Sequence, residues 1–363
     1  MAVTYQDYLS RKDEGDPVAD EVVVQLLDNG QVNSVNKLFR QIETADQSPP
    51  ADCPPVLRDY FESTKKMPDF FEPSMLNDIA EFFKHHKLPA AAVQATAGLV
   101  GTYLSPIGAK TLHSTHELDQ PHRRLSQSTR LFTGMGDDDA FTPRSRLIPT
   151  CQKVRLVHAA IRQLHLRSGK WDRDKYGMPV SQYYTGGAAI VFSAGTLDAL
   201  KRLGVNVTAR EEYGYCTAWA IIAHYLGVPD EIIPREVDQV YGLWYSARDE
   251  EWAPSDEGIL LTEECIKLYD RYVPPGITAA FVRRALSDKY ADMVKVPESA
   301  LFDTGADFAS TADSLFGRTP VGNNDIVKTA MGKLGEAVEK VSREAFTHGQ
   351  ETEPQMTDRI SKD

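Results

Sequence analysis

Apolar residues spaced three and four positions apart recur along most of this chain, and this spacing limits its possible folds. Leu76, Ile79, Phe82 and Phe83 share one helical face. Alternation of apolar and polar residues, which would indicate β-strands, is scarce. We therefore predict an all-α fold with a multi-helix core. Other segments with helical spacing are 93–100, 121–133, 150–168, 188–203, 211–226 and 261–272.

A proline-rich stretch separates the first part of the chain from the rest. Pro49, Pro50, Pro54 and Pro55 stand close together, and proline fits neither a helix interior nor a central strand. We predict an N-terminal arm over residues 1–55, a main helical domain over 56–290 and a C-terminal extension over 291–363.

The C-terminal extension contains one amphipathic pattern. Val327, Met331, Leu334, Val338 and Val341 lie along one stripe, while the opposite face alternates Lys, Glu and Arg. We predict a helix over residues 324–346 that packs on its own domain, with a partner protein or a membrane surface as alternatives. The last dozen residues are predicted to form a disordered tail.

The charge and hydropathy of the chain exclude some partners. The net charge is -12 and the pI about 5.3, which opposes a phosphate backbone, so we expect no nucleic acid. The longest apolar stretch, 88–100, is shorter than the roughly 20 residues of a transmembrane helix, and residues 1–20 lack a signal pattern. We expect an intracellular protein without a transmembrane segment, with four reduced cysteines. No sequence feature indicates an oligomeric state.

Several common catalytic motifs are missing from the sequence. It has no Gly-x-Gly-x-x-Gly after a strand, no Gly-x-x-x-x-Gly-Lys-Ser/Thr, no Gly-x-Ser-x-Gly and no His-Glu-x-x-His. Nucleotide binding and serine hydrolysis are therefore not expected. The stretch from His113 to His122 gathers possible zinc ligands, but Pro121 breaks the helix that would align them, which favours a polar loop over a metal site.

His158 is the strongest candidate for a chemical centre. Val154, Val157, Ile161 and Leu164 form an apolar stripe, and His158 lies beside it, one turn after Val154. The imidazole should therefore point inward, where a neutral ring could give Nε2 to a metal while a carbonyl holds Nδ1–H. Periodicity alone favours the alternative of a hydrogen-bonded core histidine.

Two arginines flank this histidine on the same helix. Arg155 precedes His158 by three residues and Arg162 follows it by four, so both can stand near its face. Guanidinium groups bind carboxylates, and both arginines could therefore meet the propionates of a haem. For each arginine taken alone, an exposed or capping side chain is the alternative.

The order of motifs along the chain is more informative than any single motif. The series is Gly15-Asp16-Pro17-Val-Ala-Asp20, Arg124-Leu-Ser-Gln127-Ser128, Val154-Arg155-Leu-Val-His158-Ala-Ala-Ile-Arg162, Gly177-Met-Pro179-Val-Ser-Gln182 and Leu226-Gly-Val-Pro229. This series resembles the bacterial latex-clearing proteins, which are rubber oxygenases, and the wider group of MpaB oxygenases. The resemblance extends from near residue 15 to about residue 270.

The resemblance implies a globin-reminiscent helical core that holds haem b and uses dioxygen to cleave carbon–carbon double bonds of isoprenoid chains. It implies that His158 is the proximal iron ligand. Arg124, Gln127 and Ser128 take the positions of the family's distal Arg-x-x-Lys-Thr segment, so a glutamine replaces the lysine. Gln127 is a neutral amide that can only donate or accept hydrogen bonds, and we expect an open or water-filled sixth coordination position.

The sequence leads to one main hypothesis and two alternatives. The main hypothesis is a haem b-dependent oxygenase that acts with dioxygen on a small hydrophobic unsaturated substrate, isoprenoid or lipid-like. The alternatives are a haem-binding sensor or carrier without turnover, and a haem-free helical scaffold in which His158 is structural. In the main hypothesis, catalysis is assigned to Arg124, Gln127 and Ser128, and haem binding to His158, Arg155 and Arg162.

Overall fold

Every regular element in the described part of the chain is a helix. The computed structural model describes residues 2–114, 131–298, 323–347 and 354–358, and no strand occurs in these ranges. The prediction of an all-α fold is therefore confirmed. The α-helices are α1 (Tyr5–Leu9), α2 (Pro17–Asp28), α3 (Val32–Phe39), α4 (Pro55–Ser63), α5 (Met75–Val93), α6 (Leu99–Tyr103), α7 (Pro106–His113), α9 (Leu147–Ser168), α10 (Arg173–Tyr176), α11 (Gln182–Ile190), α12 (Thr196–Arg202), α13 (Ala209–Tyr225), α14 (Val237–Glu251), α15 (Asp256–Tyr269), α16 (Ile277–Leu286), α17 (Asp288–Met293) and α19 (Asn323–Thr347).

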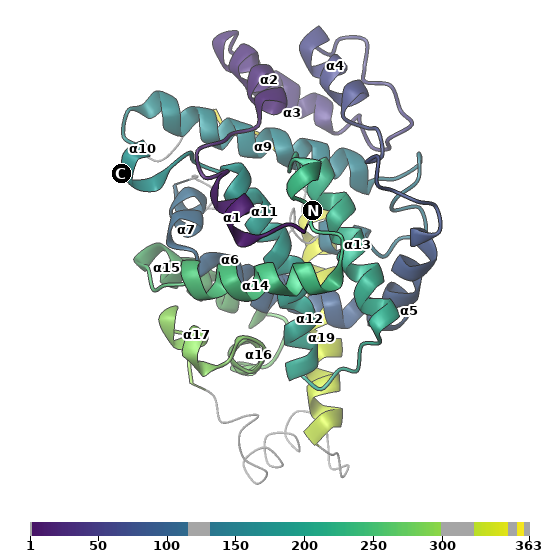
Figure 1. The fold of residues 1–363 in the computed structure, drawn as a ribbon, viewed down its shortest axis with the longest axis vertical. Helices are drawn as coiled ribbons and strands as arrows, with labels where there is room; N and C mark the ends of the chain where they lie inside the picture. The colour runs from purple at the N-terminus through teal and green to yellow at the C-terminus, as the bar shows by residue number, and fades with distance from the viewer. Residues whose placement is uncertain (1, 115–130, 299–322, 348–353, 359–363) are drawn as a thin grey trace.

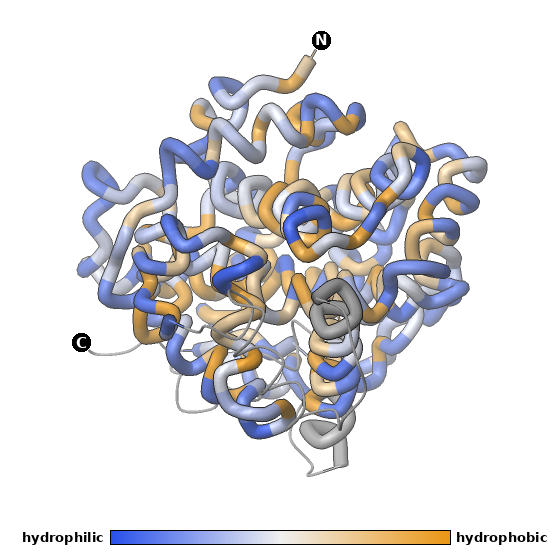
Figure 2. The backbone as a smooth tube through the Cα atoms, turned by 90° about the horizontal axis from the view of Figure 1, so that it is seen from below, coloured by the Kyte–Doolittle hydropathy of each residue, from blue (hydrophilic) through white to orange (hydrophobic). Residues whose placement is uncertain are grey.

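The helices are arranged on two sides of α9. Figure 1 shows α9 running across the molecule, with α2, α3 and α4 above it and the other helices mostly below. Figure 2 shows hydrophilic and hydrophobic residues alternating along many of the outer helices, as expected when each helix buries one face. The predicted segments 150–168, 211–226 and 261–272 fall largely within α9, α13 and α15. Segment 121–133 lies almost wholly outside the described residues.

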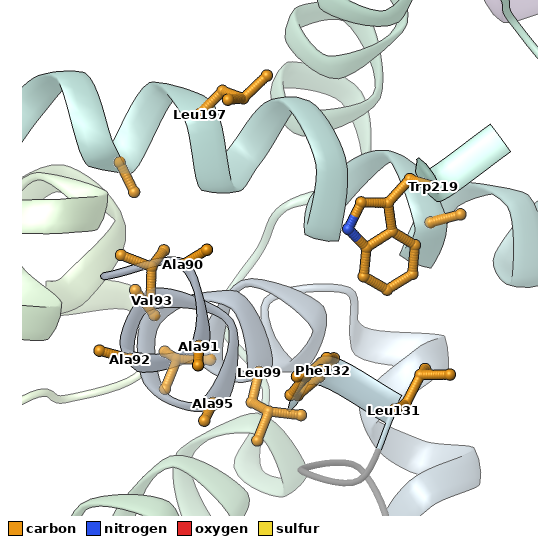
Figure 3. Packing of buried hydrophobic residues seen from close by; sticks show 14 of the residues in the cluster. Ala90, Ala91, Ala92, Val93, Ala95, Leu99, Leu131, Phe132, Leu197 and Trp219 are labelled. Carbon is orange, nitrogen blue, oxygen red and sulfur yellow. The ribbon is translucent and has the colours of Figure 1, made fainter. Parts of the chain in front are cut away.

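The main core is organised around α5 and α13, which pack along each other. Figure 3 shows the alanines 90–92 of α5 in the same cluster as Phe132 and Trp219. A Cβ at Gly214 of α13 would lie 2.1 Å from the carbonyl oxygen of Asp78 in α5. Only glycine therefore allows the two backbones to approach this closely.

A second, smaller core lies between α9 and the layer of α2, α3 and α4. The first 55 residues, predicted as an arm, contribute α2 and α3 to this layer. Helix α2 begins where the Asp16 side chain accepts the N–H of Ala19, with Pro17 at the first helical position. The N-terminal segment thus packs directly on the helix that carries His158.

Helix α19 packs on α5 and contacts α15 and α16. It is the amphipathic helix predicted from the sequence, and it packs on its own chain as expected. Its buried apolar side chains are those of Ala330, Met331, Leu334, Ala337, Val338 and Val341.

Residues 354–358 do not match the prediction of a disordered tail. Asn36 of α3 donates from Nδ2 to the carbonyl oxygen of Met356 (2.8 Å), and its Oδ1 accepts the N–H of Met356 (2.9 Å). Met356 is buried in the core under α2. Periodicity could not predict this contact, because the two residues are 320 positions apart and the segment has no helical spacing.

Two further expectations concern membranes and cysteines. Within the described ranges, no helix combines the length and the apolar character needed to cross a membrane. All four cysteines are buried, and no disulfide joins them in the structure.

Replacing Asn36 by alanine should lower the free energy of unfolding by about 1–3 kcal/mol, because the buried N–H and C=O of Met356 would lose their partner. Asn33→Ala is the matched control, since exposed Asn33 reaches Asp358 of the same segment, and its effect should stay within about 0.5 kcal/mol. Urea unfolding of both variants measures the difference. Equal losses would contradict a specific role for the Asn36 contact.

Candidate functional site

Helix α9 supports the site and has defined ends. At its start, Ser145 Oγ accepts the N–H groups of Leu147 and Ile148, each at 3.1 Å, which satisfies donors that a helix leaves free. At its end, Gly169 has a φ of 67°, the left-handed conformation that commonly terminates helices. The helix spans 22 residues between these points.

Different faces of α9 meet different parts of the molecule. Leu156 and Ala160 are buried under the α2 layer, whereas His158 and Ile161 line a cavity that opens to solvent. The other walls come from α1, α6, α7, α11 and α14, which Figure 1 shows grouped below α9. These walls are mostly apolar and aromatic. The inward direction predicted for His158 therefore leads into a cavity.

His158 is held in its neutral form. Burial lowers the pKa of His158 to about 4; the charge of Arg162 acts in the same direction and that of Asp16 opposes it. The Nδ1 atom is buried and has no hydrogen-bond partner in the described part of the chain. The carbonyl partner predicted for Nδ1 is thus not found among these residues. A neutral imidazole retains one unprotonated nitrogen, which can bind a metal.

Arg155 forms a two-bond ion pair with Asp16, the residue that caps α2. Nε donates to Oδ2 at 2.5 Å and Nη2 to Oδ1 at 2.8 Å, and both side chains are largely buried. Gly227, just after α13, packs against this ion pair. A Cβ there would lie 2.4 Å from Nε of Arg155, and the φ of +87° also favours glycine. Asp16, Arg155 and Gly227, which belong to three different motifs of the sequence, are therefore in contact here.

Arg162 joins α9 to α2 and to the loop before α11. Nε donates to both carboxylate oxygens of Asp20 (2.9 and 3.0 Å), and Nη1 donates to the carbonyl oxygen of Val180 (2.5 Å). Val180 lines the cavity and has a φ of +48°, which is an outlier for a β-branched residue. Such a conformation persists only where surrounding contacts hold it, and the bond from Arg162 is one of these.

A third ion pair continues the series at the surface. Arg167 Nη1 lies 2.8 Å from Asp28 Oδ1, with side chains 40% and 59% exposed. Because the aspartates and the arginines follow in the same order along their helices, α2 and α9 run parallel. The two inner pairs are buried and the outer pair is not.

A hydrogen-bonded chain lies on the wall formed by α1, α11 and α14. Tyr183 donates its hydroxyl proton to Glu251 Oε1 (2.7 Å), and its oxygen lies 2.9 Å from the Tyr5 hydroxyl. Since Tyr183 has only one proton to give, Tyr5 is the donor in the second bond. Lys12 Nζ lies 3.3 Å from the same Glu251 oxygen. Burial, followed by the bonds with Tyr5 and Glu251, raises the pKa of Tyr183 well above its ordinary value.

The histidine stands without companion ligands. In the described ranges, no three His, Cys, Asp or Glu side chains are arranged to hold a metal ion.

The distal residues predicted from the sequence, Arg124, Gln127 and Ser128, lie outside the described residues. The same holds for most of the stretch that begins at His113, which itself ends α7. The structure does bring His158, Arg155 and Arg162 together, with the imidazole on the cavity and both guanidinium groups on carboxylates of the α2 segment.

Sequence reasoning missed three residues of the site: Asp16, Asp20 and Glu251. A signal for the first two was present, because two acids four residues apart and two arginines seven residues apart each share one helix face. Glu251 belongs to no motif, and its place in the site depends on how α14 packs.

Known proteins show clear similarity to this chain. Residues 84–303, more than half of the chain, match the family described as ER-bound oxygenase mpaB/B'/Rubber oxygenase, catalytic domain. Over 294 residues the chain is 29% identical to the rubber oxygenase of Streptomyces sp. (strain K30), covering 79% of this chain and 72% of that protein. A solved structure of latex clearing protein LCP in the closed state shares the fold, with a TM-score of 0.78, 24% identity and coverage of 91% of both chains.

Asp20→Asn should lower the free energy of unfolding by about 3–5 kcal/mol, because the buried charge of Arg162 would lose its carboxylate. Asp28→Asn, which removes the exposed partner of Arg167 from the same helix, should cost less than about 1 kcal/mol. Chemical denaturation at one fixed pH compares the two variants. Similar losses would show that the buried pair is not what holds α2 on α9.

Proposed function

Because the chain belongs to the family of MpaB and rubber oxygenase catalytic domains, we propose that it is a haem b-dependent oxygenase. In this proposal His158 is the protein ligand of the haem iron and dioxygen is the co-substrate. The cavity takes a small hydrophobic unsaturated molecule, isoprenoid or lipid-like, whose carbon–carbon double bond is cleaved. The Streptomyces relative, named as a rubber oxygenase, supports this class of substrate.

The observation that carries the proposal is a neutral histidine on the wall of a mostly apolar cavity. Haem would bring four nitrogen ligands of its own and would take a further ligand from the protein, which His158 would supply. Because Nδ1 of His158 is buried, Nε2 is the nitrogen available to a molecule in the cavity. A Cβ at Gly187 of α11 would meet nothing within 4 Å, so a flat ring could approach the backbone on this wall. These residues fit the group.

When bound, haem would supply the binding and activation of dioxygen. The residues of the chain position the reactants. With a pKa of about 4, His158 keeps an unprotonated ring nitrogen at neutral pH. Helix α9 is held in place by its buried ion pairs with Asp16 and Asp20. The apolar walls bind the hydrocarbon part of a substrate and exclude water.

Arg155 and Arg162 have a positioning role in this proposal besides their predicted contact with the cofactor. Arg155 donates hydrogen bonds to Asp16, which caps α2, and Arg162 donates to Asp20 within α2. Nη2 of Arg162 has no partner in the described part of the chain, and it is the donor left for the predicted contact. We retain Arg124, Gln127 and Ser128 as the proposed distal residues, with Gln127 leaving the sixth position open or water-filled.

A haem-binding carrier without turnover is the second candidate function. The observation that favours it is Gln127, which replaces the lysine of the family's distal segment. Oxygen uptake by the haem-loaded protein, with short isoprenoids as test substrates, separates the two candidates. Uptake with cleaved products supports the oxygenase, and a haem-loaded protein that consumes no oxygen with any of them supports the carrier.

His158→Ala should abolish the Soret band of the purified protein. Loss of groups that merely orient a metal ligand costs up to about 100-fold in affinity, so loss of the ligand itself should cost more. His165→Ala is the matched control, because His165 lies on the same helix and bonds Ser114 rather than lining the cavity. It should retain the band. Absorption spectra after reconstitution with haem test both variants, and an absent band in the wild type would exclude both haem-based functions.

A further inference from the structure

Arg248 of α14 is a cation on the cavity wall, and no other described lining residue carries a positive charge at neutral pH. Its side chain is 15% exposed. The guanidinium carbon lies 5.7, 5.0 and 5.2 Å from the ring centroids of Trp244, Tyr245 and Tyr290. These cation–π contacts hold the group in place without accepting its N–H hydrogen bonds.

Most donors of Arg248 are available. Nε donates to Asp249 at 3.0 Å, and the Asp249 side chain is 57% exposed, so this pair is weak. Within the described ranges, neither Nη atom has an acceptor. The charges of Arg155 and Arg162, in contrast, are already balanced by buried carboxylates.

The lining carboxylate nearest to Arg248 in sequence is that of Glu251, and its negative charge already has partners in the protein. Glu251 accepts a hydrogen bond from Tyr183 and pairs with Lys12. Its negative charge is therefore matched by groups of the protein. Among the described lining residues, the charge whose ion-pair partner is mostly exposed is the positive charge of Arg248.

We propose that Arg248 binds a carboxylate group carried by a molecule that occupies the cavity. The planar fork of a guanidinium matches a carboxylate, and the bond is stronger in an apolar cavity than in water. Two molecules offer this chemistry. One is haem through a propionate, and in that case the inference rests on the proposed function; the other is an unsaturated fatty acid through its head group.

The test compares ligands with and without a carboxylate. Haem-free full-length protein is titrated with haem and with haem dimethyl ester, and binding is followed at the Soret band. The variant is Arg248→Met, which keeps an apolar side chain against the rings. The matched control is Arg235→Met, since the Arg235 guanidinium also lies over a ring, that of Phe70 at 4.7 Å, but does not line the cavity.

If a propionate is the partner, the wild type binds haem about ten- to a hundredfold more tightly than the ester, as charge-assisted hydrogen bonds allow. Arg248→Met removes this preference and Arg235→Met keeps it. Arg248→Lys, which keeps the charge but not the fork, recovers part of it.

If a fatty acid is the partner, the preference for haem over its ester is the same in the wild type and in Arg248→Met. Instead, the haem-loaded variant binds oleate more weakly than the wild type by a similar factor, while binding of oleyl alcohol does not change. Calorimetry measures both affinities.

The proposal is overturned if Arg248→Met changes neither the preference for haem over its ester nor the preference for oleate over oleyl alcohol, or if Arg235→Met has the same effect. A wild type without any Soret band would overturn the proposed function and the propionate partner. Oleate and oleyl alcohol, titrated into the haem-free protein, would then still decide on Arg248.

Discussion

The parallel ion pairs between α2 and α9 are the interaction on which the rest of the site depends. Two of the pairs are buried, and removing such charges from water costs several kcal/mol per ion, about as much as their attraction returns. Their main contribution is therefore to fix positions, because the planar guanidinium can donate two hydrogen bonds to one carboxylate in only a few relative orientations. Arg155 and Arg162 lie about one turn on either side of His158. A rotation or shift of α9 would break both pairs, so they fix the direction of the imidazole.

Members of the same pairs also influence the charge of His158, although burial has the larger effect. Burial is the largest cause of its lowered pKa, Arg162 adds to the effect, and Asp16 reduces it. Each arginine is bonded to a carboxylate, so the positive charges near the ring are compensated without a proton on the imidazole. Burial, with Arg162 near the ring, therefore keeps His158 neutral, which is the state that a metal ligand needs.

Local patterns predicted most of the framework but few of the contacts that complete the site. The spacing that identifies α9, α13 and α15 is contained within each helix, and so is the inward direction of His158. Asp16, in contrast, lies 139 residues from Arg155, and Asn36 lies 320 residues from Met356. Spacing within each segment can place the two acids on one helix face and the two arginines on another, but it does not show which distant side chains meet. The partner expected for Nδ1 came from an analogy with other histidine ligands, and packing of the described residues does not supply it.

The N-terminal segment contributes to more of the site than its distance in sequence suggests. The family match begins at residue 84, yet Asp16 and Asp20 hold the helix that carries the histidine, and Tyr5 and Lys12 complete the wall around Glu251. The first 20 residues thus help to position both polar parts of a mostly apolar cavity, which are His158 and the group around Glu251. Because Lys12 and the tyrosines satisfy Glu251, the charge left on the α14 wall is positive. An occupant held there by an acidic group would have its hydrocarbon part along the apolar walls, so the first 20 residues influence both the orientation of the occupant and the position of the histidine.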